Sequence, residues 1–167
     1  AAVRTVSHAI PQDIPGELQK LAHKPSPDNP KESSFVLLDS GLDALASRLW
    51  LAEKAEKTLD VQYYIFHGDK TGALVAEALM KAADRGVRVR VLLDDIYTHK
   101  REVALMAMDS HPNIEIRLFN PFFYRGGYYL AQLENYLMDK RIIRRMHNKL
   151  FVAHDEFSFV DLDVMAS

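Results

Sequence analysis

The sequence contains no cysteine, and this single absence excludes several kinds of site. Disulfides, thiol catalysis and zinc sites built on thiolates all require that residue. No apolar run approaches the roughly 18 residues that a bilayer-spanning helix needs. The opening stretch, AAVRTVSHAIPQ, also lacks the apolar core of a secretory signal peptide. None of these absences identifies the compartment in which the protein works.

Neither sign of charge is in large excess. The chain has 21 Lys and Arg against 23 Asp and Glu, for a formal net charge of -2. Global charge therefore provides no attraction to nucleic acid or to an anionic membrane, and any such attraction must come from a local patch. A length of 167 residues with 48% hydrophobic content is typical of one compact domain.

The first 34 residues differ in composition from the rest of the chain. The stretch HKPSPDNPKESS carries three prolines and few apolar residues, which predicts an extended arm or linker over residues 1–34. The regular domain is expected over residues 35–167.

Within this domain, apolar residues recur with alternating helical and strand periods. Helices are expected after a cap at Ser40, between a cap at Thr71 and a left-handed stop at Gly86, and over residues 101–110. Strands are expected over residues 59–66, 87–95, 114–120, 147–153 and 157–166. Short links between alternating strands and helices favour right-handed crossovers. We therefore predict an α/β fold with a mostly parallel or mixed sheet and helices on both of its faces.

The tripeptide His147-Asn148-Lys149 has the clearest chemical potential. At the start of a strand, alternation would place His147 and Lys149 on one face, about 7 Å apart. An imidazole can attack phosphorus and form a covalent intermediate, while a fixed ammonium neutralises a phosphate oxygen. Neither a metal nor any other cofactor is required. The pattern is weak on its own, because a histidine and a lysine at this spacing often occur by chance and are merely solvated.

Basic residues gather just before this tripeptide, at Lys140, Arg141, Arg144 and Arg145. Such a patch fits an anionic phosphate substrate or anionic lipid headgroups. The end of the first strand is a second candidate region, since sites in parallel sheets gather at strand ends. We expect four residues to contact the substrate: Asn148, Arg145, Tyr64 and His67. Aromatic residues at a strand end are nevertheless more often packing than ligand contacts.

Two further groups allow alternative interpretations. Asp94 and Asp95 end the second predicted strand, where carboxylates can cap the next helix or bind a cation. Capping is favoured, because no third metal ligand is in view. Aromatic residues crowd around Gly126 and Gly127, and they fit a lipid-facing lip and a buried seam equally well. The cluster comprises Phe119, Phe122, Phe123, Tyr124, Tyr128 and Tyr129.

The segment RRMHNKLFVA, preceded in order by LDVQYYIF, GVRVRVLLDD and HPNIEIRLFNPF, resembles the N-terminal half of phospholipase D superfamily enzymes. Among these, bacterial cardiolipin synthases of the C-type branch are the most similar, over about residues 35–153. The family's hallmark is H-x-K, four residues and then Asp, present once in each of two halves that face each other. The resemblance implies that His147 and Lys149 belong to the first of these motifs. It also implies that one motif histidine attacks phosphorus while the other protonates the leaving alcohol.

The same resemblance implies a function and its partners. The activity would be phosphatidyl transfer to make cardiolipin, through a phosphohistidine intermediate, at the bacterial inner membrane. The substrates would be phosphatidylglycerol and, as a further candidate, phosphatidylethanolamine, with the membrane surface as a partner. A second motif would come from the same chain or from a homodimer, and no nucleic acid is expected. Two alternatives stay open: a phosphodiesterase or nuclease that completes its site by homodimerising, and a damaged, non-catalytic binding domain.

The sequence departs from the family after the lysine. The motif's aspartate should fall at position 154, where His154 stands, and Asp155 is one place late. On an alternating strand one residue separates the two faces. The family's glycine pair and asparagine are also absent, since no glycine follows Gly127. We hypothesise that a loop carrying them is missing between Ala153 and His154, and a second half after residue 167. The competing interpretation is a true deletion that cripples the site.

Overall fold

The computed structural model describes residues 37–66, 68–95, 98, 102–121, 133 and 145–153, and the backbone of residues 157–160. Several predictions fall outside these residues. They are the arm over residues 1–34, the substrate contact at His67, the basic residues Lys140, Arg141 and Arg144, and all of the aromatic cluster except Phe119.

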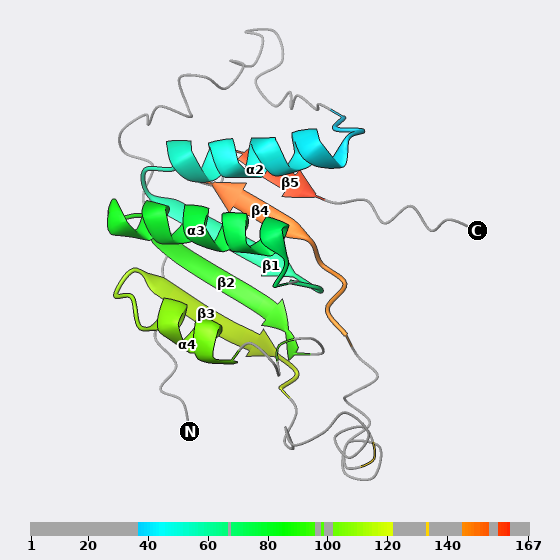
Figure 1. Cartoon of the computed structure of the whole chain (residues 1–167), viewed down its shortest axis with the longest axis vertical. Coiled ribbons are helices and arrows are strands. Elements are labelled where there is room, and N and C mark those ends of the chain that lie inside the picture. The colour runs from blue at the N-terminus through cyan, green and yellow to red at the C-terminus, as the bar shows by residue number, and fades with distance from the viewer. Residues whose placement is uncertain are drawn as a thin grey trace, which may run out of the picture.

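A five-stranded sheet forms the centre of the fold, in the order β3-β2-β1-β4-β5 (Figure 1). The strands are β1 (Thr58–Tyr63), β2 (Arg88–Asp94), β3 (Ile114–Phe119), β4 (Leu150–Ala153) and β5 (Phe157–Val160). The first three are parallel, whereas β4 pairs antiparallel with β1 and β5 pairs antiparallel with β4. The predicted α/β class with a mixed sheet is confirmed.

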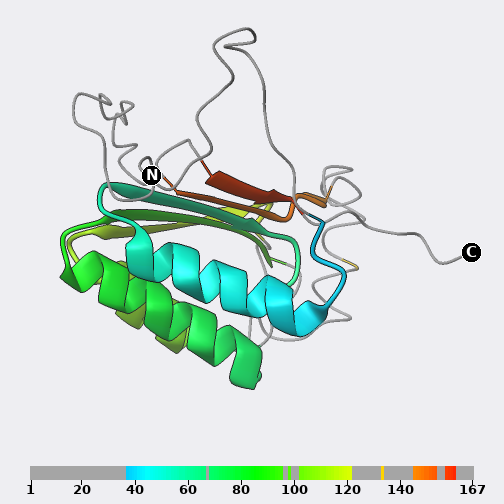
Figure 2. The ribbon, with the colours of Figure 1, turned by 90° about the horizontal axis from the view of Figure 1, so that it is seen from above.

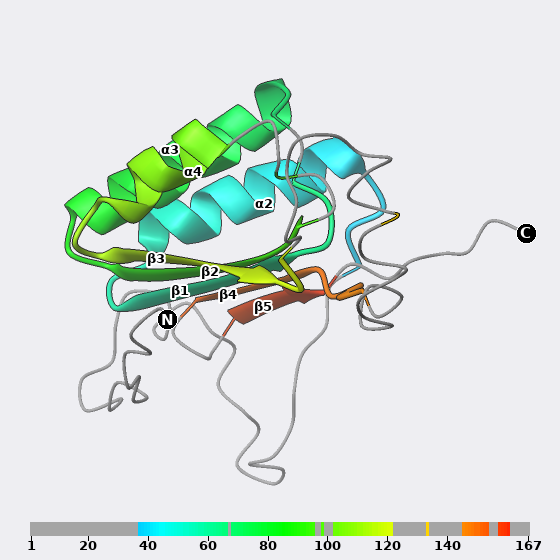
Figure 3. The same cartoon turned by 90° about the horizontal axis from the view of Figure 1, so that it is seen from below.

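Three helices cover one face of this sheet, as Figures 2 and 3 show from opposite directions. They are α2 (Gly41–Lys54), α3 (Lys70–Asp84) and α4 (Glu102–Asp109). The prediction of helices on both faces is wrong for the described helices. The connections from β1 to β2 and from β2 to β3 move in the same direction across the sheet, and both are expected to be right-handed. Their helices, α3 and α4, must therefore lie on the same side of the sheet.

The helix ends test the predicted signals individually. Ser40 caps α2, its hydroxyl accepting hydrogen bonds from the backbone N–H of Leu42 at 3.2 Å and Asp43 at 3.4 Å. The cap predicted at Thr71 is wrong, because α3 begins two residues earlier, after Asp69. The Asp69 carboxylate accepts from the Gly72 N–H at 2.8 Å and so satisfies one of the orphan donors of the first turn. Gly86 has a φ of +95°, the predicted left-handed stop.

Alternation along the strands separates an apolar face from a polar one. Buried side chains from β1, β2 and β4 point toward the helices and build the core together with Leu51 and Leu79. The strand residues are Leu59, Val61, Val89, Val91, Leu93, Phe151 and Ala153. On the other face, Asp60 pairs with Arg90 across β1 and β2. Within the described residues, no helix is long and apolar enough to cross a membrane.

Candidate functional site

Residues 147–149 lie at the carboxyl edge of the parallel strands. Leu150, the first residue of β4, pairs with Gln62 near the end of β1. Because β4 runs antiparallel to β1, the residues just before β4 reach the edge where β1 and β2 end. His147 and Lys149 therefore precede the strand that was predicted to contain them, and they lie where open α/β sheets usually carry their sites.

The imidazole of His147 stacks on the ring of Tyr64, the residue that follows β1. The ring centroids are 4.1 Å apart and the planes are inclined by 24°. His147 is exposed, while Tyr64 is half-buried. A stack through one face fixes the plane of the imidazole and directs its in-plane nitrogens past the tyrosine rather than at it. Tyr64, predicted to contact substrate, thus contacts the histidine of the motif.

The next two residues continue the attachment to β1. The side-chain amide of Asn148 donates a hydrogen bond of 3.2 Å to the side-chain oxygen of Gln62. Lys149 is half-buried, two residues from His147. Stacking and hydrogen bonding therefore hold two consecutive side chains of the motif against the end of one strand.

Asp94 connects the same segment to β2, and sequence reasoning missed this connection. Its carboxylate accepts one hydrogen bond from the Arg145 guanidinium at 3.1 Å and one from the Met146 backbone N–H at 3.0 Å. The favoured prediction for Asp94, a cap on the following helix, does not describe these contacts. Arg145, predicted to bind substrate, forms an ion pair with Asp94, and a substrate role for it stays a prediction. The neighbouring Asp95 accepts a hydrogen bond from the Thr98 hydroxyl.

The described part of the chain contains no group of three or more histidine, aspartate or glutamate side chains that could hold a metal ion. The groups gathered at the edge are instead an imidazole, an ammonium and a buried carboxylate–guanidinium pair. The first two can supply a nucleophile or proton carrier and a charge for a phosphate oxygen.

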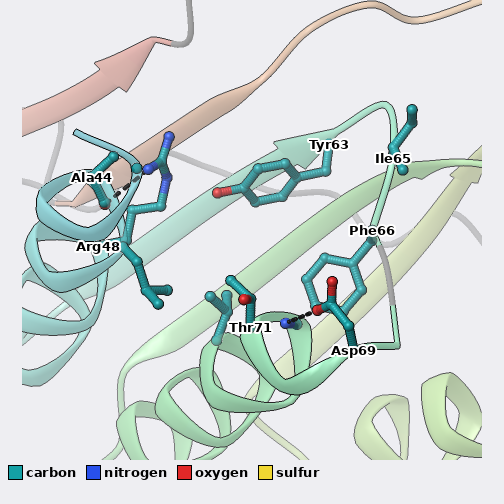
Figure 4. A pocket seen from close by; sticks show the side chains of 11 residues that line it. Ala44, Arg48, Tyr63, Ile65, Phe66, Asp69 and Thr71 are labelled. Carbon is teal, nitrogen blue, oxygen red and sulfur yellow. Dashed lines mark hydrogen bonds between the residues drawn. The ribbon is translucent and has the colours of Figure 1, made fainter. Parts of the chain in front are cut away.

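A separate cavity of about 380 Å³ lies on the helix-covered side of β1 (Figure 4). Tyr63 lines it together with Arg48, Asp69 and Thr71, whereas His147 does not. The Arg48 guanidinium donates a hydrogen bond of 2.8 Å to the carbonyl of Ala44. The adjacent tyrosines at the end of β1 thus serve different regions, since Tyr63 faces the helices and Tyr64 faces the histidine.

The chain is similar in sequence to a known family of proteins. Residues 50–160, more than half of the chain, match the family model described as "Cardiolipin synthase, PLD-like domain". Cardiolipin synthase C of Escherichia coli (strain K12) is 46% identical over 158 residues, covering 83% of this chain and 33% of the relative. Cardiolipin synthase 1 of Bacillus anthracis is 29% identical over 142 residues, covering 85% and 25%. The solved structure of NucT from Helicobacter pylori matches with a TM-score of 0.47 and 22% identity, covering 71% of this chain and 65% of that one.

This chain spans a third or less of the length of these two synthases. The loop hypothesised between Ala153 and His154 stays a prediction. With a family model that matches more than half of its length, the chain belongs to the cardiolipin synthase family of phospholipase D-like domains.

Proposed function

We propose that this chain supplies one half of the active site of a phosphatidyltransferase that makes cardiolipin. The observation that carries the proposal is the pair His147 and Lys149, set at the carboxyl edge of the sheet with the imidazole stacked on Tyr64. In a chain of the cardiolipin synthase family, an imidazole and an ammonium at this edge suit attack on a phosphodiester.

The reaction would proceed in two displacements at phosphorus. A histidine nitrogen attacks the phosphorus of a phospholipid, and the bond from phosphorus to the headgroup oxygen breaks. A second histidine gives the departing oxygen its proton, which leaves a phosphatidyl group on the first histidine. The hydroxyl of another phospholipid then attacks, gives its proton back to the second histidine and releases the product. Lys149 would neutralise the non-bridging phosphate oxygens in both transition states.

This scheme needs a second motif, which would come from another half of the same polypeptide or from a second copy. The aspartate of the first motif would come from the loop predicted after Ala153. If that loop is truly deleted, the alternative of a damaged binding domain gains support. Phosphatidylglycerol is the proposed donor and acceptor, with phosphatidylethanolamine as a further donor. The proposed location is the bacterial inner membrane, reached peripherally or through parts of the protein beyond these residues.

The test is to incubate the purified full-length protein with phosphatidylglycerol vesicles in excess chelator and to identify the products by mass spectrometry. Cardiolipin together with released glycerol is the expected result, because the scheme uses no metal. Phosphatidic acid alone would mean that water is the acceptor. Cleavage of DNA without any lipid product would replace the proposal with the nuclease alternative. The absence of turnover on every substrate would favour the binding domain.

A further inference from the structure

Asp94 ends β2 with a carboxylate that is completely buried. Its side chain has 0% exposure and that of Arg145 has 10%. A buried carboxylate is costly unless it is paired and hydrogen-bonded, so its partners indicate what it holds in place. Its partners include the guanidinium of Arg145 and the backbone N–H of Met146, the two residues directly before His147.

We infer that Asp94 is a positioning residue for His147. Its carboxylate binds the side chain of Arg145 and the backbone N–H of the next residue, Met146. These two contacts fix both the position and the direction of the chain immediately before His147. His147 then reaches Tyr64 at 4.1 Å without being in a strand. This inference rests on the proposed role of His147, and it assigns to Asp94 no contact with substrate.

The geometry explains why a carboxylate is required at this place. Two donors approach two different oxygens, Arg145 at Oδ1 and Met146 at Oδ2. An asparagine has the same shape but only one acceptor oxygen, so its NH₂ group must face one of the two donors. The Asp94→Asn variant therefore loses one attachment while the volume of the site stays the same. Arg145→Met removes the charged partner but leaves the Met146 hydrogen bond in place.

The test combines turnover with the NMR signal of the His147 ring in full-length protein with labelled histidines. In the Asp94→Asn variant we expect kcat for phosphatidyl transfer to fall about 100-fold, the cost of a misplacement near 1 Å. KM should be unchanged, because the Asp94 side chain has no exposed surface for substrate to contact. The ring-proton shift of His147 should move toward its value in a Tyr64→Leu variant, which lacks the stacked ring. The Arg145→Met variant should change kcat and the His147 ring-proton shift in the same directions as Asp94→Asn does, but by smaller amounts.

The spectroscopic result separates positioning from general stability. A residue that only stabilised the fold would lower the melting temperature and leave the His147 shift of the folded protein unchanged. A wild-type shift and a wild-type kcat in Asp94→Asn would overturn the inference. If the Asp94→Asn variant does not fold, the Arg145→Met variant decides. A wild-type kcat and a wild-type His147 shift in that variant would overturn the inference, whereas a partial change of the His147 shift would support it. If the wild-type protein transfers no phosphatidyl group, the proposed function fails while the shift still tests the positioning.

Discussion

The two faces of the sheet are built from the same strands but serve different purposes. On the helix-covered face, alternate residues such as Val61 and Leu93 are almost completely buried against other apolar groups. On the opposite face the same strands carry Asp60 and Gln62 in β1 and Arg90 in β2. The same alternation leads to the buried Asp94, the last residue of β2, and to Tyr64, the first residue after β1.

The difference teaches how a short parallel sheet can support a site. The apolar face provides the free energy of burial and holds the strand ends at fixed positions. The polar face can then place a tyrosine and a carboxylate at the edge without loss of core volume. Tyr64 and Asp94, which position His147, thus belong to the polar side of the alternation along β1 and β2. The segment that they contact lies more than fifty residues later in the chain.

The largest expected effect on stability lies on the apolar face. Phe151 in β4 is 1% exposed and is the largest fully buried side chain among the described residues. Phe151→Ala should lower the free energy of unfolding by about 3–5 kcal/mol, the usual cost of such a cavity. Its neighbour Val152 points to the polar face and is half-buried, so Val152→Ala should cost about 1 kcal/mol. Denaturant unfolding of both variants checks the comparison, and equal losses would contradict the assignment of the two faces.

At the edge of the sheet, activity and stability should separate. Lys149→Ala should slow phosphatidyl transfer by about 10²- to 10³-fold, near 3 kcal/mol of transition-state stabilisation, because it removes a charge from the developing phosphate oxygens. The half-buried side chain contributes little to the core, so the melting temperature should change only slightly. Lys81→Ala, on the exposed surface of α3, is the matched control and should retain full turnover. A rate loss shared by both variants would argue against a specific role for Lys149.

A smaller effect is expected within the polar face itself. Asp60 and Arg90 form a two-point ion pair across β1 and β2, with 21% and 38% of their side chains exposed. Partial exposure to solvent screens such pairs, so Asp60→Asn should cost about 0.2–1 kcal/mol. The cost should shrink at high salt, which unfolding measurements at two ionic strengths would reveal. A loss comparable to that of Phe151→Ala would mean that the polar face stabilises the fold as much as the core.

The smallest effect lies outside the sheet, on the surface of α3. The side-chain hydrogen bond from Lys81, and then its charge, lower the pKa of the Glu77 carboxyl. Because the pKa of Glu77 is lower in the folded state than in the unfolded state, the interaction with Lys81 stabilises the fold at pH values above the ordinary pKa of the carboxyl. This stabilisation is lost as pH falls through the lowered pKa. In Lys81→Ala the pKa of Glu77 should return toward its ordinary range, as an NMR titration of the carboxyl carbon would show. A pKa that stayed low would identify a cause other than Lys81.

Much of the fold could be predicted because its signals are local. Runs of strand-forming residues located all five strands that the structure describes, and Gly86 marked the end of a helix as expected. The cap of α3 was misassigned because Asp69 and Thr71 are both good capping residues, and only the backbone path distinguishes them. The side of the sheet that the described helices cover depends on the direction of the crossovers, which periodicity does not encode.

The candidate site was predictable only in part, for the same reason. Histidine and lysine two residues apart form a local pattern, and the neighbouring segments resemble those of a known family. The contacts that hold the motif, Asp94 to Arg145 and Tyr64 to His147, join residues far apart in the chain and leave no periodic signal. Aspartate at the end of a strand is equally consistent with a cap, a metal ligand and a positioning group.

The central claim is that His147 performs the chemistry of phosphatidyl transfer. The most direct measurement is the rate of cardiolipin formation by full-length His147→Ala protein, alongside its melting temperature. His111→Gln is the matched control, because His111 lies just before β3, at the opposite end of the parallel strands. We predict that His147→Ala abolishes turnover while the melting temperature stays near that of the wild type, since the imidazole is exposed. Cardiolipin formation at the wild-type rate by the His147→Ala protein would contradict the account.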